Sequence, residues 1–210
     1  MPIANAIVNP NRFDETSNLT FLCAAGVAFL VLSGIVTRFR EENFFKKKNI
    51  QEPDLLSYLD LVALGTVCDV VPLKGLNRAF VFQGLKVLQK RNNLGIKTLS
   101  DVANINSKIS TYHLGYIIGP KINAGGRIGK SDHGANLLLT EDPEIAFKIS
   151  KELNQLNEKR KNIEGIILEE AIKIAKHKDN NPILVVSSNT WHEGITVSYT
   201  HLRAHETEEN

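Results

Sequence analysis

A long stretch with helical periodicity, from Pro143 to about His177, constrains the fold of this chain more than any other feature of the sequence. Asp142 is a good N-cap residue and Pro143 suits a first helical turn, so the pattern predicts where the helix begins. At about 1.5 Å per residue, an unbroken helix of this length measures roughly 50 Å, which is long for one small domain. We therefore expect it to connect two bodies, and we expect any bend at Gly165. The apolar positions that set the period are Ile145, Ile149, Leu153, Leu156, Ile163, Ile167, Ala171 and Ile174.

Two short apolar runs have the composition of buried strands. Ala4 to Val8 stops at the turn Asn9–Asn11, and Ile183 to Val186 follows the long helix. The first run begins almost at the first residue, so we expect the chain to start at a cut edge rather than at a natural domain boundary. Between the two runs the sequence predicts helices over Leu19–Arg40, Pro53–Gly65, Asn77–Lys90, Thr98–Ala103 and Ser110–Ile118.

Composition sets broad limits on the class of protein. The 210 residues are 42% hydrophobic, enough for one domain with a full core, or one and a half. Lys plus Arg number 25 and Asp plus Glu 23, and this near balance neither favours nor excludes a nucleic-acid partner. Cys23 and Cys68 both lie in apolar runs, which indicates buried thiols in a reducing compartment rather than a disulfide. No signal peptide or bilayer-spanning segment is visible, so we expect a cytoplasmic protein.

One carboxylate, Asp69, stands in the apolar run Leu61–Leu73, LVALGTVCDVVPL. Burying it among valines is costly unless a helix N-terminus, a basic side chain or a metal ion stabilises its charge. Two interpretations are open at this point. Asp69 caps the helix that follows Pro72, or it has a metal-binding or catalytic role.

A second notable segment, GPKINAGGRIG over Gly119–Gly129, is so rich in glycine that we expect a loop. Its backbone amides, together with Lys121 and Arg127, are the ingredients of an anion-binding nest. A plain tight turn between two helices fits the composition equally well. It does not match the dinucleotide-binding fingerprint, because it follows a helical stretch and not a strand.

Three motifs, in consistent order over roughly residues 3–195, resemble the RecJ exonucleases of the DHH phosphoesterase superfamily. IVNPNR followed by CAAGVAF is similar to the segment after the Asp-His-His motif, and LVALGTVCDVVPL is similar to the fourth motif. IGPKINAGGRIG, the long helix and WHEG are similar to the bridge into the DHH-associated domain. The resemblance implies an α/β fold, with part of a DHH-type parallel-sheet domain over residues 1–140 and a connecting helix over 141–178. The first strand and motif of the DHH-associated domain would then occupy 179–195, and 196–210 would be a disordered or artefactual tail.

The resemblance also implies an activity and a set of site residues. The activity is a 5′→3′ single-stranded-DNA exonuclease that releases 5′-mononucleotides in DNA repair and recombination. Asp69 matches the metal-binding aspartate, which makes it the expected catalytic and metal residue. Arg127 matches an arginine near the substrate phosphate, and Asn123, Gly125 and Gly126 belong to the same segment. The expected cofactor is Mn²⁺ or Mg²⁺ in a two-metal centre, and the expected partners are single-stranded DNA and, for the intact protein, single-strand-binding protein and a helicase.

Other features of that family are missing from these 210 residues, which contain no D-x-D and no His-His pair. Asp69 alone cannot hold a dinuclear centre, so our hypothesis is that this polypeptide is inactive by itself although it belongs to an enzyme. The alternatives are a DHH-superfamily phosphoesterase that acts on short oligonucleotides and a non-catalytic nucleic-acid-binding relative. His201 and His205 do not complete an H-E-x-x-H zinc motif, because Leu202 stands where the glutamate belongs.

Overall fold

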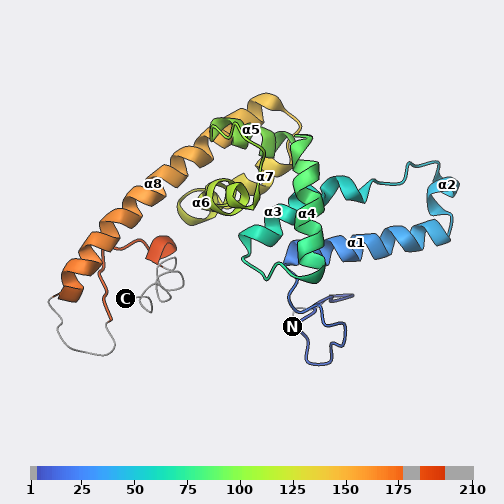
Figure 1. Cartoon of the computed structure of the whole chain (residues 1–210), viewed down its shortest axis with the longest axis horizontal. Coiled ribbons are helices and arrows are strands. Elements are labelled where there is room, and N and C mark those ends of the chain that lie inside the picture. The colour runs from blue at the N-terminus through green and yellow to red at the C-terminus, as the bar shows by residue number, and fades with distance from the viewer. Residues whose placement is uncertain (1–3, 177–184, 197–210) are drawn as a thin grey trace. The chain divides into compact units, whose positions relative to one another are not determined.

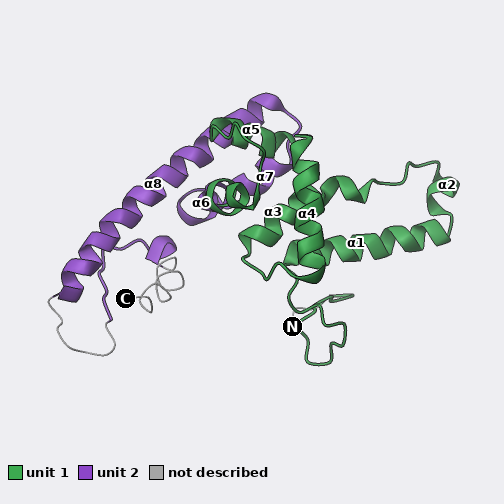
Figure 2. Cartoon of the chain, viewed as in Figure 1, with its two compact units in different colours: residues 1–119 green, residues 120–210 purple. Residues whose placement is uncertain are grey.

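A computed structural model describes residues 4–176 and 185–196 of the chain (Figure 1). The chain divides into two compact units, residues 1–119 and 120–210, coloured separately in Figure 2. None of the described helices combines the length and apolarity that crossing a bilayer requires.

Unit 1 is built from helices. Its described elements are α1 (Ala24–Glu41), α2 (Phe44–Lys48), the short 3₁₀-helix η1 (Leu55–Tyr58), α3 (Leu59–Cys68), α4 (Gly75–Gln89), α5 (Leu94–Val102) and the π-helical segment η2 (His113–Ile118). The helices predicted over Asn77–Lys90 and Leu19–Arg40 are confirmed as α4 and α1, although α1 begins only at Ala24.

The core of unit 1 forms around α3, which is apolar on nearly all sides and therefore buried. Its main partner is α4, and the two helices approach so closely that a Cβ added at Gly84 would collide with the carbonyl oxygen of Leu59. Leu22, Leu59, Val62 and Phe80 form one buried cluster, in which Phe29 meets Phe80 edge-to-face with ring centroids 5.4 Å apart. This packing fixes the position of α3, and with it the residues at its C-terminal end.

Unit 2 contains α6, which begins at the boundary residue (Gly119–Ile128), α7 (His133–Leu139) and α8 (Pro143–Lys176). The long helix predicted from Pro143 is confirmed, and it runs through Gly165 as one element. Its predicted N-cap is confirmed too, because Asp142 Oδ1 accepts hydrogen bonds from the backbone N–H of Glu144 (2.8 Å) and Ile145 (3.2 Å). α7 packs against α8, and Leu137 and Leu153 are fully buried in this unit.

The predicted α/β fold class is wrong for the part of the chain that the structure describes, which contains helices and no strand. Residues 4–8, where the first strand was expected, are exposed and form no regular secondary structure, with a bend at Asn5. A strand is stable only when a neighbour accepts and donates its backbone hydrogen bonds, so an apolar run alone does not make one. In the second expected strand, Val185 and Val186 are also not in a strand, and residues 183–184 lie outside the described residues. The predicted boundaries at 140 and 178 and the predicted nature of the tail stay predictions.

Candidate functional site

Asp69 lies at the C-terminal end of α3 and is exposed to solvent. Its backbone N–H donates to the carbonyl oxygen of Gly65 at 3.0 Å, and α3 ends there. The expectation of a buried carboxylate is therefore wrong: α3 stops before the following valines enclose it, and Val70 itself is 86% exposed. The capping interpretation is wrong as well, because α4 begins at Gly75 with Lys74 as its N-cap residue and no side-chain cap.

The residue after Asp69 has an unusual backbone conformation. Val70 has φ +54°, in the left-handed region that β-branched residues rarely adopt. Its N–H donates to the carbonyl oxygen of Val67 at 3.2 Å, so Val70 occupies the position that glycine usually takes at the end of a helix. Two residues further on, the carbonyl oxygen of Pro72 accepts a 3.0 Å hydrogen bond from Nδ2 of the fully buried Asn77. The turn that presents Asp69 is thus strained and tied to α4.

The last turn of α3 also contacts η2. The Sγ of Cys68 donates to the carbonyl oxygen of Leu114 at 3.6 Å, and a Cβ added at Gly119 would collide with the same sulfur. Burial, and next the charge of Asp69, raise the pKa of the Cys68 thiol to about 11. Cys68 is therefore a neutral packing residue and not a nucleophile or metal ligand.

The buried carboxylate of this region is Asp60, which sequence analysis did not single out. Asp60 lies in the first turn of α3, is 5% exposed, and accepts a 2.7 Å hydrogen bond at Oδ1 from the N–H of Leu61. Desolvation by burial raises its pKa, and the backbone hydrogen bond opposes this shift. Asp60 and Asp69 are nine residues apart on one helix, about 14 Å along its axis, so they do not share a cation. Asp60, like Asp69, has apolar neighbours in the sequence, here Leu59 and Leu61.

No group of three or more His, Cys, Asp or Glu side chains that could hold a metal ion occurs within residues 4–176 and 185–196. Asp69 is one carboxylate, and a two-metal site requires several oxygen or nitrogen ligands. The described residues therefore do not fit a complete two-metal centre.

The glycine-rich segment forms the helix α6, so the prediction of a loop with nest-like backbone amides is wrong. The glycines allow helices to approach closely instead. A Cβ added at Gly125 would lie 3.0 Å from Cδ2 of Leu153 on α8, and one at Gly129 would lie 2.6 Å from Cδ1 of Leu156 on the same helix. Amides inside a helix donate to backbone carbonyls and are not free for an anion.

The predicted substrate-binding residues occupy two faces of α6. Asn123, Gly126 and Arg127 are spaced by three and four residues and share one face. Asn123 and Gly126 are exposed, Arg127 is half-buried in the last turn, and a Cβ added at Gly126 would meet no atom within 4 Å. Gly125 faces α8. α6 thus brings three of the four residues to one open face, whereas Asp69 belongs to unit 1.

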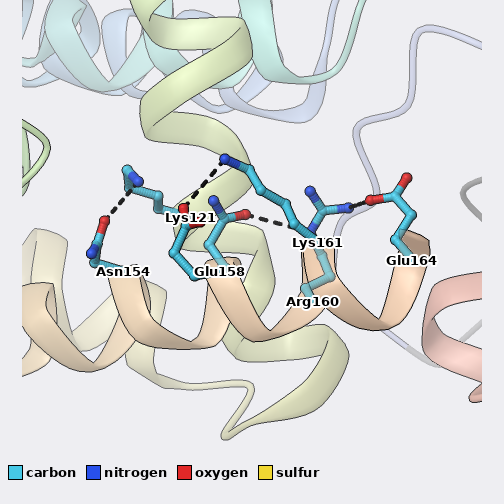
Figure 3. A network of polar contacts seen from close by, with 7 residues as sticks. Lys121, Asn154, Glu158, Arg160, Lys161 and Glu164 are labelled. Carbon is cyan, nitrogen blue, oxygen red and sulfur yellow. Dashed lines mark hydrogen bonds and ion pairs between the residues drawn. The ribbon is translucent and has the colours of Figure 1, made fainter. Parts of the chain in front are cut away.

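Lys121 connects α6 to α8 and is only 7% exposed. Its Nζ donates to Oδ1 of Asn154 at 2.7 Å (Figure 3). Burial lowers the pKa of Lys121, and the nearby Glu158 opposes that shift. Further along the same helix, Lys161 pairs with Glu158 at 3.3 Å and Arg160 pairs with Glu164 at 2.7 Å. Lys121 is therefore a structural lysine, and not part of the anion-binding nest that was one of two interpretations of this segment.

The WHEG segment packs onto the end of α6 that carries Arg127. A Cβ added at Gly194 would lie 2.7 Å from the carbonyl oxygen of Arg127. Trp191 Nε1 donates to Oε2 of Glu170 on α8 at 2.9 Å, and the exposed His192 accepts at Nδ1 from the N–H of Gly194 at 3.2 Å. These contacts join three sequence motifs of unit 2 into one packed region.

The chain is similar in sequence to several exonucleases of one kind. It is 38% identical over 202 residues to the single-stranded-DNA-specific exonuclease RecJ of Escherichia coli, and the match covers 93% of this chain and 35% of the relative. It is 29% identical over 201 residues to the protein of the same name from Bacillus subtilis, and that match covers 93% of this chain and 23% of the relative. It thus spans about a third of the length of the first of these relatives. A crystal structure of RecJ with Mn²⁺ from Thermus thermophilus matches with a TM-score of 0.63 at 27% identity, covering 77% of this chain and 24% of that one. A structure of exonuclease RecJ bound to manganese gives the same TM-score at 29% identity, covering 73% and 38%. No protein-family profile matches the chain.

Proposed function

We propose that this chain, which belongs to the RecJ family of single-stranded-DNA-specific exonucleases, supplies one metal-binding carboxylate and a phosphate-binding helix to such an enzyme. The reaction is the 5′→3′ hydrolysis of phosphodiester bonds in single-stranded DNA to 5′-mononucleotides, in repair and recombination. The observation that carries the proposal is the 38% identity to the Escherichia coli relative over 93% of this chain.

Asp69 is the residue we propose for metal binding, with Mn²⁺ or Mg²⁺ as the ion. Its exposed position at the end of α3 leaves the carboxylate open to a cation. The left-handed Val70 beside it supports a functional role, because backbone strain of this kind concentrates at functional sites. Solved structures of RecJ contain bound manganese or Mg²⁺, ions that prefer oxygen ligands. The co-ligands of a two-metal centre would come from parts of the relatives that this chain does not span.

Arg127 is the residue we propose for contact with a DNA phosphate. A guanidinium group offers a planar fork of donors that matches two phosphate oxygens and stays charged at all relevant pH values. Asn123 shares the helix face with Arg127, and the open space at Gly126 leaves room for a strand to approach. Gly125 acts indirectly in this proposal, by allowing α6 to lie close to α8.

The partners follow from the same proposal. Single-stranded DNA is the substrate, and single-strand-binding protein and a helicase would be partners of the intact enzyme. A cytoplasmic location is consistent with the two free thiols, of which Cys23 is buried.

A chimera tests the proposed function. Residues 4–195 of this chain replace the aligned segment of the Escherichia coli relative, and Mn²⁺-dependent digestion of single-stranded DNA is measured. We expect an active chimera that loses about 100-fold or more of its activity with Asp69→Ala. Asp101→Ala is the matched control: its carboxylate is exposed, pairs with Arg91, and should change activity less than twofold. A folded, active chimera that is indifferent to Asp69→Ala excludes the metal role.

The isolated chain gives a second test. Because one carboxylate does not make a two-metal centre, we expect no Mn²⁺-dependent digestion by the purified 210-residue protein. Digestion that Asp69→Ala abolishes would refute the hypothesis that this chain is inactive by itself.

A further inference from the structure

A hollow of about 390 Å³ lies in unit 2, between the segment that joins α6 to α7 and the middle of α8. Lys130 of the joining segment and His133, the first residue of α7, line one side of it, and Glu152, Gln155 and Lys159 line it from α8. Its floor is formed where the backbone of Gly129 meets Leu156, since a Cβ at Gly129 would lie 2.6 Å from Cδ1 of that leucine. We call these lining residues the α8 hollow.

The two lysines of the α8 hollow have no partner of opposite charge in the part of the chain that the structure describes. Lys130 and Lys159 are both exposed, and neither side chain makes a hydrogen bond or an ion pair there. The next two cations along α8 are paired, as Arg160 contacts Glu164 and Lys161 contacts Glu158. The hollow is therefore a place where positive charge is left available.

His133 adds a buried polar atom that makes no hydrogen bond. This atom is Nδ1, and Glu152 Oε2 lies 3.7 Å away, beyond hydrogen-bonding distance. A buried polar atom without a partner costs free energy, and an additional group in the hollow would offset that cost. When Nδ1 carries its hydrogen, the ring donates from this atom, either to Glu152 or to an anion bound in the hollow.

We propose that the α8 hollow binds a phosphate group of a single-stranded DNA backbone, a proposal that rests on the proposed function and extends it by a second contact. Two lysines, one histidine and one glutamate line the hollow, so its net charge favours an anion and disfavours a metal cation. Lysines bind phosphates as point charges, without reading the base sequence. Lys130 follows Arg127 by three residues, so the hollow continues from the end of α6 that carries the proposed phosphate-binding arginine.

Metal-free DNA binding tests this proposal. The affinity of the full chain for a dye-labelled oligothymidylate is measured by fluorescence anisotropy in EDTA, at several salt concentrations around 0.1 M. We expect the double substitution Lys130→Glu, Lys159→Glu to weaken binding at least tenfold and to reduce the slope of log affinity against log salt by about one. Both side chains are exposed and unpaired, so the fold should persist, as checked by circular dichroism.

The matched control reverses two charges elsewhere on the same helix, with Lys173→Glu and Lys176→Glu. These exposed lysines lie at least about 21 Å further along α8, beyond the Debye length of about 10 Å at 0.1 M salt, so we expect a change of twofold or less. Equal weakening by both double variants, or no binding by the unmodified chain, overturns the proposal. Neither result depends on metal, so failure here is distinguishable from failure of the nuclease chimera.

A second arm separates DNA from free phosphate. The ring resonances of His133 are followed by NMR during titration with the oligothymidylate and, separately, with inorganic phosphate. We expect both to shift the resonances, the oligothymidylate at a much lower concentration, and His133→Gln to weaken DNA binding about threefold. A shift with inorganic phosphate and none with DNA identifies a free-anion site and overturns the assignment to a DNA backbone.

Discussion

The end of α3, which carries Asp69, and α6, which carries Arg127, position these two proposed site residues by different means. At the end of α3 the chain turns through the left-handed Val70, and Asn77 holds the carbonyl oxygen of Pro72. In α6 a glycine lets the helix lie against Leu153 of α8. One residue is therefore positioned by backbone conformation and hydrogen bonds, the other by close helix packing. Substitutions in the two regions should consequently affect stability in different ways.

The largest expected effect concerns the packing that carries α3. In Gly84→Ala the new methyl group would collide with the carbonyl oxygen of Leu59 and with Ala63, neither of which can swing away as a flexible side chain does. We expect a loss of about 3 kcal/mol in the free energy of unfolding, measured by urea denaturation. Gly34→Ala in α1 is the control: no atom lies within 4 Å, so the higher helix propensity of alanine should stabilise by up to about 1 kcal/mol. Similar values for the two variants would contradict the close approach of α4 to α3.

Two adjacent glycines of α6 test how closely this helix packs against α8. In Gly125→Ala the methyl group would press on Leu153 and on the carbonyl oxygen of Lys130, and we expect a loss of about 1–2 kcal/mol. Gly126→Ala meets open space inside a helix, and we expect a gain of about 0.5–1 kcal/mol. Urea denaturation of both variants measures the difference. If this segment were a loop with nest-like amides, alanine at Gly126 would bring no gain of helix propensity.

Much of the helical structure was predictable because helix signals are local. The start of α8 follows from Asp142 and Pro143, and its length follows from one period maintained along the sequence. The fold class was not predictable in the same way. The run Ala4–Val8 has strand composition, but strand formation depends on a partner elsewhere, which composition does not report.

At the candidate site, local sequence patterns were misleading for two segments. Apolar neighbours in the sequence suggested that Asp69 was buried, yet α3 ends there and only Asp60 is enclosed. Four glycines within Gly119–Gly129 suggested a loop, because glycine adopts backbone conformations that other residues avoid. Glycine also occurs where two helices pack too closely for a side chain, and this is the role of Gly125 in α6. In both cases the deciding contacts come from elements distant in sequence. The roles of Asp69, Arg127, Asn123, Gly125 and Gly126 stay predictions.

A smaller effect is expected at the strained residue next to Asp69. Val70→Gly places at φ +54° the one residue that adopts this conformation without steric cost, and the valine side chain is too exposed to contribute much packing. Relief of the left-handed strain outweighs the greater conformational entropy that glycine loses on folding. We therefore expect a net gain of about 0.5–1 kcal/mol in the free energy of unfolding. Val70→Ala is the control, since alanine keeps most of the left-handed strain and should gain less. Destabilisation by Val70→Gly would show that the strain is not there.

The smallest expected effect separates the two carboxylates of α3. Burial raises the pKa of Asp60, so the folded protein binds its proton more tightly than the unfolded chain does. The stability that this preference contributes is fully present below the unfolded pKa, near 3.9, and is lost as the pH rises through the higher folded pKa. Asp60→Asn is neutral at every pH, so we expect it to gain stability relative to the unmodified chain as the pH rises from about 3 to 7, measured by urea denaturation. At the acid end both side chains are neutral and the two proteins should be nearly equally stable, which is the internal control. A difference that stays constant over this range would mean that Asp60 ionises as easily in the folded protein as in water, and that α3 does not bury it.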